Sequence, residues 1–477
     1  MNPGRKQNLS FIFLICLKIF CPVQYAAGYR MHTIIHMNLL KTGLALAIGM
    51  LPFCLLHAQL AANEDADTML TKEALVYPDL VSRFYAARHQ KPFWFSGADD
   101  SGELRRMLVR RLDSASSLGL DSSDYHPLVL TANLNKNFSG RDSSRLMATD
   151  RIFTDAAIHY CKDLRQGAGI SRWIETDQVS PKLAPGNDEY IIRALLAAGN
   201  GADLVRLMEV LQPDGMGYPL LKTFLREKNR ENDSLAVKKL IVSLNLLRWL
   251  THFQLPQYIV VNIPSATLFF VAQDTLRLTM KVVLGKPSTP TPRFASFCNE
   301  IILYPYWNVP RKIAVNELLP LFKKNPNNVN TMDMQIVDGQ GHVLDPFRLP
   351  WASYSKKNFP YMVRQSTGCD NALGVVKFNL TSPFDVYMHD TNFKTAFLSS
   401  RRYYSHGCIR LEKPIELANL LLGNKLDSVF LQSCLKNQQP VHLSVAHPVP
   451  VFVLYMPVVA VEGETPIFFP DVYHLIR

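Results

Sequence analysis

A cysteine with the means to act as a nucleophile stands at position 408, in the run Tyr404-Ser405-His406-Gly407-Cys408-Ile409-Arg410. His389 lies upstream, with fifteen residues between it and Ser405. A thiol attacks a carbonyl carbon as the thiolate, and a nearby imidazole is the usual way to form one near neutral pH. Gly407 allows a tight turn and leaves room for a substrate carbonyl beside the N–H groups of Gly407 and Cys408, as an oxyanion site requires. The pattern predicts that Cys408 is a nucleophile with His389 as its general base, against the alternative of a buried structural cysteine.

The segment that ends at His389 alternates as a β-strand does. In Phe384–His389 the even-numbered residues are apolar and the odd-numbered ones polar or aromatic. The even-numbered side chains should therefore face a core, and Tyr387 and His389 should share the opposite face. Asp390 follows, and it can orient the imidazole either through its backbone carbonyl or through its carboxylate.

The other residues of the cysteine loop have supporting roles in this interpretation. Ser405 is expected to support the loop, and His406 either hydrogen-bonds the substrate or shapes the turn. Arg410 either holds a substrate carboxylate or locks the loop by bonding backbone carbonyls. The sequence leaves both pairs of alternatives open.

Two other chemistries fit the sequence poorly. His389, Asp390, His406 and Cys408 are zinc-ligand types, but His406 and Cys408 are two residues apart on a tight turn, and no second Cys/His pair completes a site. A serine hydrolase would need a Gly-x-Ser-x-Gly turn, which the sequence lacks.

The elements that must position these residues fall into two regions, which predicts an α+β fold. From about Glu73 to Leu250 apolar residues recur at helical spacing. The clearest helical segments are Leu104–Leu118, Arg151–Leu164, Tyr190–Ala198, Ala202–Leu211 and Leu235–Leu250. From Pro256 the pattern changes to short runs of β-branched and aromatic residues, which predict a mostly antiparallel sheet. These runs are Tyr258–Ile263, Thr267–Val271, Leu276–Leu284 and Glu300–Leu303.

The sheet pattern is interrupted once and ends with a helix and further strands. Between Pro310 and about Gln365 a helix is expected at Ile313–Lys324, so this stretch reads as an insertion, functional or merely decorative. After Cys408, Pro414 fits the first position of a helix and Gly423 its end. The tail, residues 441–477, is again strand-like and should complete the sheet.

The pattern His-x15-Ser-His-Gly-Cys-x-Arg resembles the signature of the L,D-transpeptidases, cysteine acyltransferases that cross-link bacterial peptidoglycan. Further segments resemble the large, YcbB-type Gram-negative subfamily: Phe84–Arg88, Phe93–Phe95, Val261–Pro264, Val283–Pro287, Tyr306–Pro310 and Asn371–Gly374. The resemblance implies a helical N-terminal scaffold domain (59–250) and a mostly β catalytic domain (256–440) with a capping subdomain inserted at about 310–365.

The resemblance also implies a reaction. Cys408 would attack the carbonyl of the third residue of a tetrapeptide stem, with D-Ala as leaving group and His389 as proton shuttle. The side-chain amine of a second stem would then take the acyl group from the thioester, which gives a 3→3 cross-link. Water as acceptor would make the protein an L,D-carboxypeptidase, and a D-amino acid would give exchange; a non-catalytic wall-binding scaffold is a further alternative.

No cofactor is implied, and carbapenems are implied as inhibitors. Trp307, Asn308 and Tyr387 are candidates to line the substrate groove, although each equally suits a core or a strand edge.

The N-terminal 58 residues predict export. They carry five basic and no acidic residues, and the apolar run Thr42–Leu56 ends at His57-Ala58, which is typical of a signal peptide cleaved after Ala58. The true start is then Met1, Met31 or Met37, and an uncleaved membrane anchor is the alternative. With the resemblance, this places the protein in the periplasm.

Charge and cysteine content agree with this interpretation. The net charge of +11 falls to +6 without the leader, since 46 basic and 40 acidic residues remain, and no basic cluster interleaved with aromatics suggests nucleic acid. Past the leader stand five cysteines, an odd number, so at least one thiol stays free. The five cysteines are Cys161, Cys298, Cys369, Cys408 and Cys434. Of these, Cys369 is either oxidisable or paired with another cysteine.

Overall fold

A computed structural model describes residues 74–96, 102–136, 138, 142–183, 187–433, 435, 438–460 and 464–476. The expected leader, residues 1–58, lies outside this set. Among the described residues, no helix combines the length and apolarity that a membrane span requires. The chain forms two compact units: one contains Gln166–Gly186 and Pro213–Arg477, and the other contains the described residues up to Arg165 with Asn187–Gln212.

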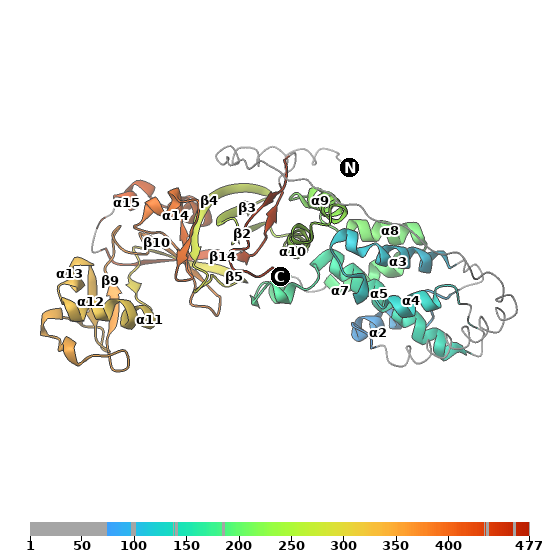
Figure 1. Cartoon of the computed structure of the whole chain (residues 1–477), viewed down its shortest axis with the longest axis horizontal. Coiled ribbons are helices and arrows are strands. Elements are labelled where there is room, and N and C mark those ends of the chain that lie inside the picture. The colour runs from blue at the N-terminus through green and yellow to red at the C-terminus, as the bar shows by residue number, and fades with distance from the viewer. Residues whose placement is uncertain are drawn as a thin grey trace, which may run out of the picture. The chain divides into compact units, whose positions relative to one another are not determined.

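The first unit along the chain is helical (Figure 1). Its longest helix, α5, is buried along most of its second half, so the shorter helices pack around it. The helices are α2 (Pro78–Ala87), α3 (Glu103–Asp113), α4 (Pro127–Asn133), α5 (Ser143–Gln166), α7 (Asn187–Ala197) and α8 (Gly201–Val210).

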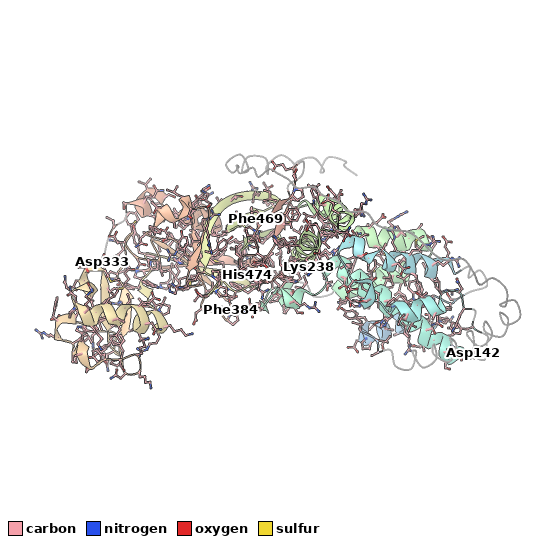
Figure 2. The ribbon with its side chains drawn as sticks, viewed as in Figure 1. Asp142, Lys238, Asp333, Phe384, Phe469 and His474 are labelled. Atoms are coloured by element: carbon pink, nitrogen blue, oxygen red, sulfur yellow. The ribbon has the colours of Figure 1, made fainter. Side chains whose placement is uncertain are left out.

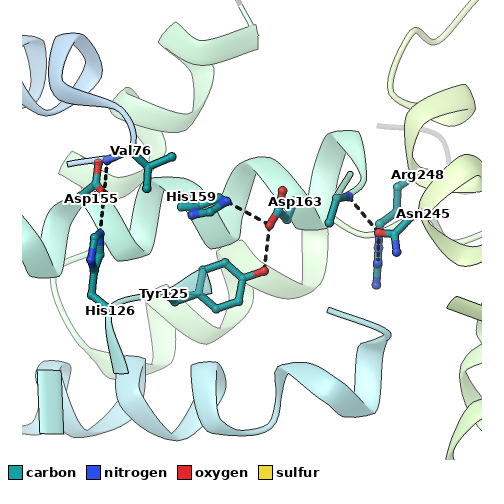
Figure 3. Close-up of polar contacts among 9 residues, drawn as sticks. Val76, Tyr125, His126, Asp155, His159, Asp163, Asn245 and Arg248 are labelled. Atoms are coloured by element: carbon teal, nitrogen blue, oxygen red, sulfur yellow. Dashed lines mark hydrogen bonds and ion pairs between the residues drawn. The ribbon is translucent and has the colours of Figure 1, made fainter. Parts of the chain in front are cut away.

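Buried carboxylates on α5 hold the loops of this unit. Asp150 is fully buried and accepts hydrogen bonds from the backbone N–H groups of Phe93 (2.8 Å), Trp94 (2.8 Å) and Phe95 (3.0 Å). One turn further, Asp155 accepts from the N–H of Val76 (2.9 Å) and pairs with His126 Nε2 (2.7 Å) (Figure 3). Since a buried N–H without a partner is costly, each carboxylate fixes a stretch of chain that has no regular structure of its own.

The second unit contains the β-sheet. Its strands run in the order β1-β5-β10-β11-β13-β4-β3-β2-β14, and β14 also pairs with β5, which closes the sheet on itself. Most of these pairings are antiparallel, while β11–β13, β14–β2, β1–β5 and β12–β4 are parallel. The strands are β1 (Thr176–Asp177), β2 (Gln257–Asn262), β3 (Thr267–Ala272), β4 (Thr275–Gly285), β5 (Phe294–Leu303), β10 (Val376–Leu380), β11 (Met388–His389), β12 (Tyr403–Ser405), β13 (Ile409–Leu411) and β14 (Val441–Leu454).

The inside of this closed sheet is the main hydrophobic core. Alternate residues of the strands, among them Phe378, Met388 and Ile409, are fully buried in it. Phe384, labelled in Figure 2, packs against the same core with its ring centroid 5.8 Å from that of Phe294. Helix α14 (Pro414–Leu421) covers one part of it, and Gly423 follows with a positive φ of 72°. The helix expected after Cys408 is therefore confirmed at both ends.

Helices α9 (Tyr218–Arg230) and α10 (Ser234–Thr251) pack on the sheet. Apolar residues of both helices share a buried cluster with Val260, Phe297 and Phe452. The sequence pattern grouped these helices with the scaffold region that ends at residue 250. Helical periodicity shows that a helix has a buried face, but it does not show which partner covers that face.

The insertion between Pro310 and Gln365 has a hydrophobic core of its own around Phe322, Trp351 and Phe359. It combines a four-stranded sheet, in the order β6-β9-β7-β8, with short helices. Its elements are β6 (Trp307–Asn308), α11 (Arg311–Ile313), the π-helical turn η6 (Ala314–Leu318), α12 (Leu319–Lys324), α13 (Asn328–Thr331), β7 (Met334–Val337), β8 (Val343–Leu344) and β9 (Met362–Gln365). The sequence predicted one helix at Ile313–Lys324. This stretch is helical throughout, but it contains the π turn η6.

The α+β fold class, with a helical region followed by a mostly β region, is confirmed. The domain limits in residue numbers remain a prediction.

Replacing Asp150 by asparagine should lower the free energy of unfolding by about 2–3 kcal/mol, because the amide NH2 would then face backbone N–H donors that need an acceptor. Urea unfolding of both proteins measures the difference. Asp113→Asn, on the exposed last residue of α3, is the matched control and should stay within about 0.5 kcal/mol. Equal losses in both variants would contradict a special role for Asp150.

Candidate active site

His389 lies between two cationic side chains on one face of the sheet. The register places it directly opposite Lys377 of β10 on one side and Arg410 of β13 on the other. Its neighbour Met388 points the other way and is fully buried in the core. Because paired residues on neighbouring strands share a face, Lys377, His389 and Arg410 form a cross-strand row.

Cys408 lies on the same face, one step along from this row. It precedes β13, whose Ile409 pairs with Met388, so Cys408 comes level with Tyr387. The thiol is half-buried, and Sγ donates to the backbone carbonyl of Asp385 at 3.8 Å. Cys161 and Cys298 are free but fully buried, and burial raises the pKa of each to about 12. Of the three free cysteines among the described residues, only Cys408 is accessible.

The imidazole of His389 is held by Asp390. Its Nδ1 contacts the backbone carbonyl of Asp390, which can only accept, so Nδ1 carries the proton and Nε2 remains a proton acceptor. The carboxylate of Asp390 is used elsewhere: it accepts from the N–H of Val375 (3.0 Å) and pairs with Lys394. Of the two ways in which Asp390 could orient the ring, the structure shows the carbonyl.

Burial keeps the imidazole uncharged. His389 is 5% exposed, and burial, followed by the charges of Arg410, Lys377 and Lys394, lowers its pKa to about 3, although the Asp390 carbonyl opposes this. The ring is therefore neutral, and able to accept a proton, at any pH near 7.

The thiol of Cys408 is also protonated at rest. Burial raises its pKa above the usual value, whereas hydrogen bonds from the backbone and side chain of Tyr387, and the charges of Lys377 and Arg410, lower it. In the part of the chain that the structure describes, the one side-chain hydrogen bond of His389 goes to Asp390, and none goes to Cys408. Tyr387 contacts both residues: it hydrogen-bonds the thiol, and its ring centroid is 5.5 Å from that of His389.

The turn before Cys408 is fixed by short-range hydrogen bonds. Ser405 is buried; its Oγ donates to the carbonyl of Cys408 (2.7 Å) and accepts from the N–H of Gly407 (3.1 Å). Thr291 Oγ1 donates to the carbonyl of Gly407 (2.8 Å). Gly407 has φ 119°, a value that side chains with a Cβ rarely adopt, while a Cβ there would meet nothing closer than 3.7 Å. Glycine is thus required for the backbone conformation more than for space.

This turn corrects one detail of the oxyanion prediction. The N–H of Gly407 is bonded to Ser405 Oγ and therefore is not directed at a substrate. The N–H of Cys408 is the candidate that remains on this loop.

The structure brings Trp307 into contact with the site and leaves two other candidates outside it. A hydrogen bond from Trp307 lowers the pKa of Tyr387, although burial raises it overall. His406 pairs through Nε2 with Glu317 Oε1 at 3.0 Å, and no hydrogen bond joins it to Cys408 among the described residues. Asn308 is exposed on β6, opposite Arg364 of β9.

Sequence reasoning missed Lys377 and Glu317. Lys377 interrupts the apolar alternation of β10, but its position beside His389 depends on the strand order. Glu317 lies on the π turn, 89 positions before the histidine that it contacts, and no local pattern marks it. Cys369 is disulfide-bonded, which decides between the two states expected for it.

Two family models match the chain. One, an L,D-transpeptidase catalytic domain, matches residues 256–451 and so includes the whole cysteine loop and β11. The other, a scaffold domain, matches residues 79–225. The chain therefore contains an L,D-transpeptidase catalytic domain and a scaffold domain. The candidate site lies inside the matched catalytic domain.

Individual proteins agree with the family match. A protein of Haemophilus influenzae named "Putative L,D-transpeptidase" is 28% identical over 403 residues, which are 84% of this chain and 78% of that protein. The solved L,D-transpeptidase from Mycobacterium smegmatis is 14% identical, with a TM-score of 0.19 over 42% of this chain and 58% of its own.

The catalytic domain of the E. faecium L,D-transpeptidase acylated by ertapenem is 13% identical, with a TM-score of 0.18 over 42% of this chain and 97% of its own. At these TM-scores neither structural match supports a conclusion on its own. This chain spans only 50–59% of the length of the first solved structures that it matches.

The pKa of His389 predicts acid sensitivity. The unfolded chain binds a proton below about pH 6.5 and the folded one only near pH 3, so this contribution to stability is complete above 6.5 and is lost as the pH falls toward 3. Between pH 7 and 4.5, the wild type should lose about 2–3 kcal/mol more unfolding free energy than His389→Gln.

Urea unfolding at the two pH values measures this difference. His447→Gln, at an exposed position, should lose as much as the wild type. Parallel losses in the wild type and His389→Gln would show that His389 is not buried in its neutral form.

Proposed function

We propose that the protein is a peptidoglycan L,D-transpeptidase of the bacterial periplasm that forms 3→3 cross-links through a thioester on Cys408, with His389 as general base and acid. The observation that carries the proposal is the shared face of β11 and β13. On it an accessible thiol, a neutral imidazole with Nε2 free to accept a proton, and a guanidinium lie together. Substrates and acceptor are inferred from this chemistry and from the family.

The first half-reaction forms the acyl-enzyme. Nε2 of His389 takes the proton of Cys408, and the thiolate attacks the carbonyl carbon of the third residue of the donor tetrapeptide. The N–H of Cys408 stabilises the negative oxygen of the tetrahedral intermediate. When the carbon–nitrogen bond breaks, the imidazolium returns its proton to the amine of D-Ala, which leaves, and a thioester remains.

The second half-reaction transfers the acyl group. The side-chain amine of a second stem attacks the thioester carbonyl, His389 takes the proton from this nitrogen, and the thiolate leaves and is reprotonated. The new amide is the 3→3 cross-link. Water in place of the amine would release a tripeptide, and a D-amino acid would give exchange.

Arg410 is the group best placed to hold the donor's terminal carboxylate. Its Nε is buried without a hydrogen-bond partner among the described residues, and burial lowers the pKa of its guanidinium. A guanidinium in this state gains most from a carboxylate, which can accept two of its N–H groups at once. The leaving D-Ala carries such a carboxylate two bonds from the nitrogen that departs.

Carbapenems should inhibit the protein by acylating the same thiol. The relative acylated by ertapenem is one solved example within the family. Asn308, His406 and Trp307 remain candidates for binding the stem outside this centre.

Mass spectrometry of disaccharide tetrapeptides incubated with the protein tests the reaction. The expected product is a dimer that has lost D-Ala and is linked between the two third residues. Cys408→Ala should form none, while Cys161→Ala, which removes a buried thiol of α5, should form as much as the wild type. Tripeptide monomers alone would point to the carboxypeptidase, and no product, with no carbapenem adduct on Cys408, would support the scaffold alternative.

The carboxylate contact predicts a substrate preference. The wild type should cleave a free-acid tetrapeptide at least tenfold more efficiently, as kcat/KM, than the same peptide ending in D-alaninamide, which corresponds to about 1.4 kcal/mol. Arg410→Met should lose this ratio, and Arg401→Met, at an exposed position before the loop, should keep it. An unchanged ratio in Arg410→Met would exclude the contact, whatever happens to the absolute rate.

A further inference from the structure

We propose that Lys377 is a positioning residue of the active site, whose ammonium group, held over the ring of Tyr387, stabilises the thiolate of Cys408. No family motif includes this lysine. The inference rests on the proposed function in one respect, namely that Cys408 is the nucleophile.

The backbone brings Lys377 to the site. It lies on β10, directly opposite His389 of β11, and therefore on the face that carries Tyr387 and Cys408. Its neighbours Val376 and Phe378 are fully buried in the core on the other face. A lysine at this position cannot turn away from the sheet face without breaking the alternation of the strand.

The side chain of Lys377 lies over the ring of Tyr387. Nζ lies 4.4 Å from the centroid of the Tyr387 ring, a cation–π contact, and Tyr387 in turn hydrogen-bonds Cys408. Glu300 lies on β5, which flanks β10 on the side opposite β11; its charge acts on Lys377, and its carboxylate bonds Asn379 and His442 (2.8 Å). The ammonium thus lies over an aromatic ring that contacts the thiol, and it interacts electrostatically with both Cys408 and Glu300.

The electrostatic evidence agrees with this geometry. Burial lowers the pKa of Lys377, and the two groups that oppose this are Cys408 first and Glu300 second. The same interaction appears from the other side, since Lys377 lowers the pKa of the thiol. Because a charge–charge interaction is strongest where water is excluded, partial burial of the ammonium strengthens its effect on the thiolate.

Few other charged groups near Cys408 could stabilise its thiolate as Lys377 does. His389 is neutral, and His406 is paired with Glu317. Asp385 contacts the thiol through its backbone carbonyl, which favours the protonated form. Arg410 is the second cation, and Tyr404 of β12 lies near it.

The lysine also bears on the base. With Lys377 and Arg410 on its two sides, a protonated His389 would be the third positive charge in a row, which both cations oppose. The same ammonium therefore favours the negative thiolate and the neutral imidazole. His389 therefore holds the thiol proton only briefly and readily gives it to the leaving amine.

The test is the pH dependence of thiol alkylation in the full-length protein, without substrate. Iodoacetamide labelling of Cys408 is followed by peptide mass spectrometry between pH 6 and 10 for the wild type, Lys377→Met and Lys377→Arg. In Lys377→Met the midpoint of the alkylation rate against pH should rise by about one pH unit, so that the alkylation rate at pH 7 falls about tenfold. Lys377→Arg keeps the charge and should stay within about twofold of the wild type.

Glu300→Gln is a second test variant, in which the lysine stays in place. Because the carboxylate no longer offsets the charge of the ammonium, Lys377 should stabilise the thiolate more, and the midpoint pH of alkylation should fall. A folded Lys377→Met with an unchanged midpoint would overturn the proposal. If Lys377→Met does not fold, as shown by thermal unfolding, an unchanged or raised midpoint in Glu300→Gln would do so.

The outcome is separable from that of the proposed function, because alkylation needs no peptidoglycan. A shifted midpoint together with absent cross-linking would leave the role of Lys377 standing and remove the transpeptidase reaction. Normal cross-linking with an unshifted midpoint would support the transpeptidase reaction and overturn the role of Lys377.

Discussion

The pairing of β11 with β10 on one side and with β13 on the other is the constraint on which the site depends. Strand β11 is only two residues long, yet Met388 anchors it in the core and His389 lies on the opposite face. A shift of one residue would exchange these two side chains and bury a histidine in an apolar core. The core therefore fixes the register, and the register sets the neighbours of His389.

The cysteine loop is a second rigid part, and it is held by different means. Ser405, Thr291 and Gly407 form a closed set of hydrogen bonds around the turn, and the φ of Gly407 permits its shape. Tyr473 adds to this frame from the C-terminal tail, since its hydroxyl donates to the carbonyl of Gly285 (2.7 Å) and accepts from the N–H of Thr291 (3.1 Å). A nucleophile that approaches a bound carbonyl gains from such a frame, because the position of its sulfur is set before the substrate arrives.

Much of this could be predicted from the sequence, and the limits have physical reasons. Local signals identified Cys408, Gly407, the face of His389, and the helix from Pro414 to Gly423, because each depends on residues close in the chain. Lys377 and Glu317 escaped notice since their partners are set by the strand order and by the packing of the insertion. The closure of the sheet by β14, which pairs with both β2 and β5, is likewise a long-range property.

The electrostatics of the site favour one description of its resting state. A thiolate–imidazolium pair would need an imidazole that protonates readily, but burial and two flanking cations keep His389 neutral. The thiol, too, is protonated at rest because burial outweighs the groups that lower its pKa. Thiol and imidazole are thus both uncharged at rest. Under the proposed function, negative charge would develop on Cys408 as its proton leaves, beside these cations and the hydrogen bonds of Tyr387. Such fixed groups stabilise the reacting state more than the resting one, and this difference is what accelerates a reaction.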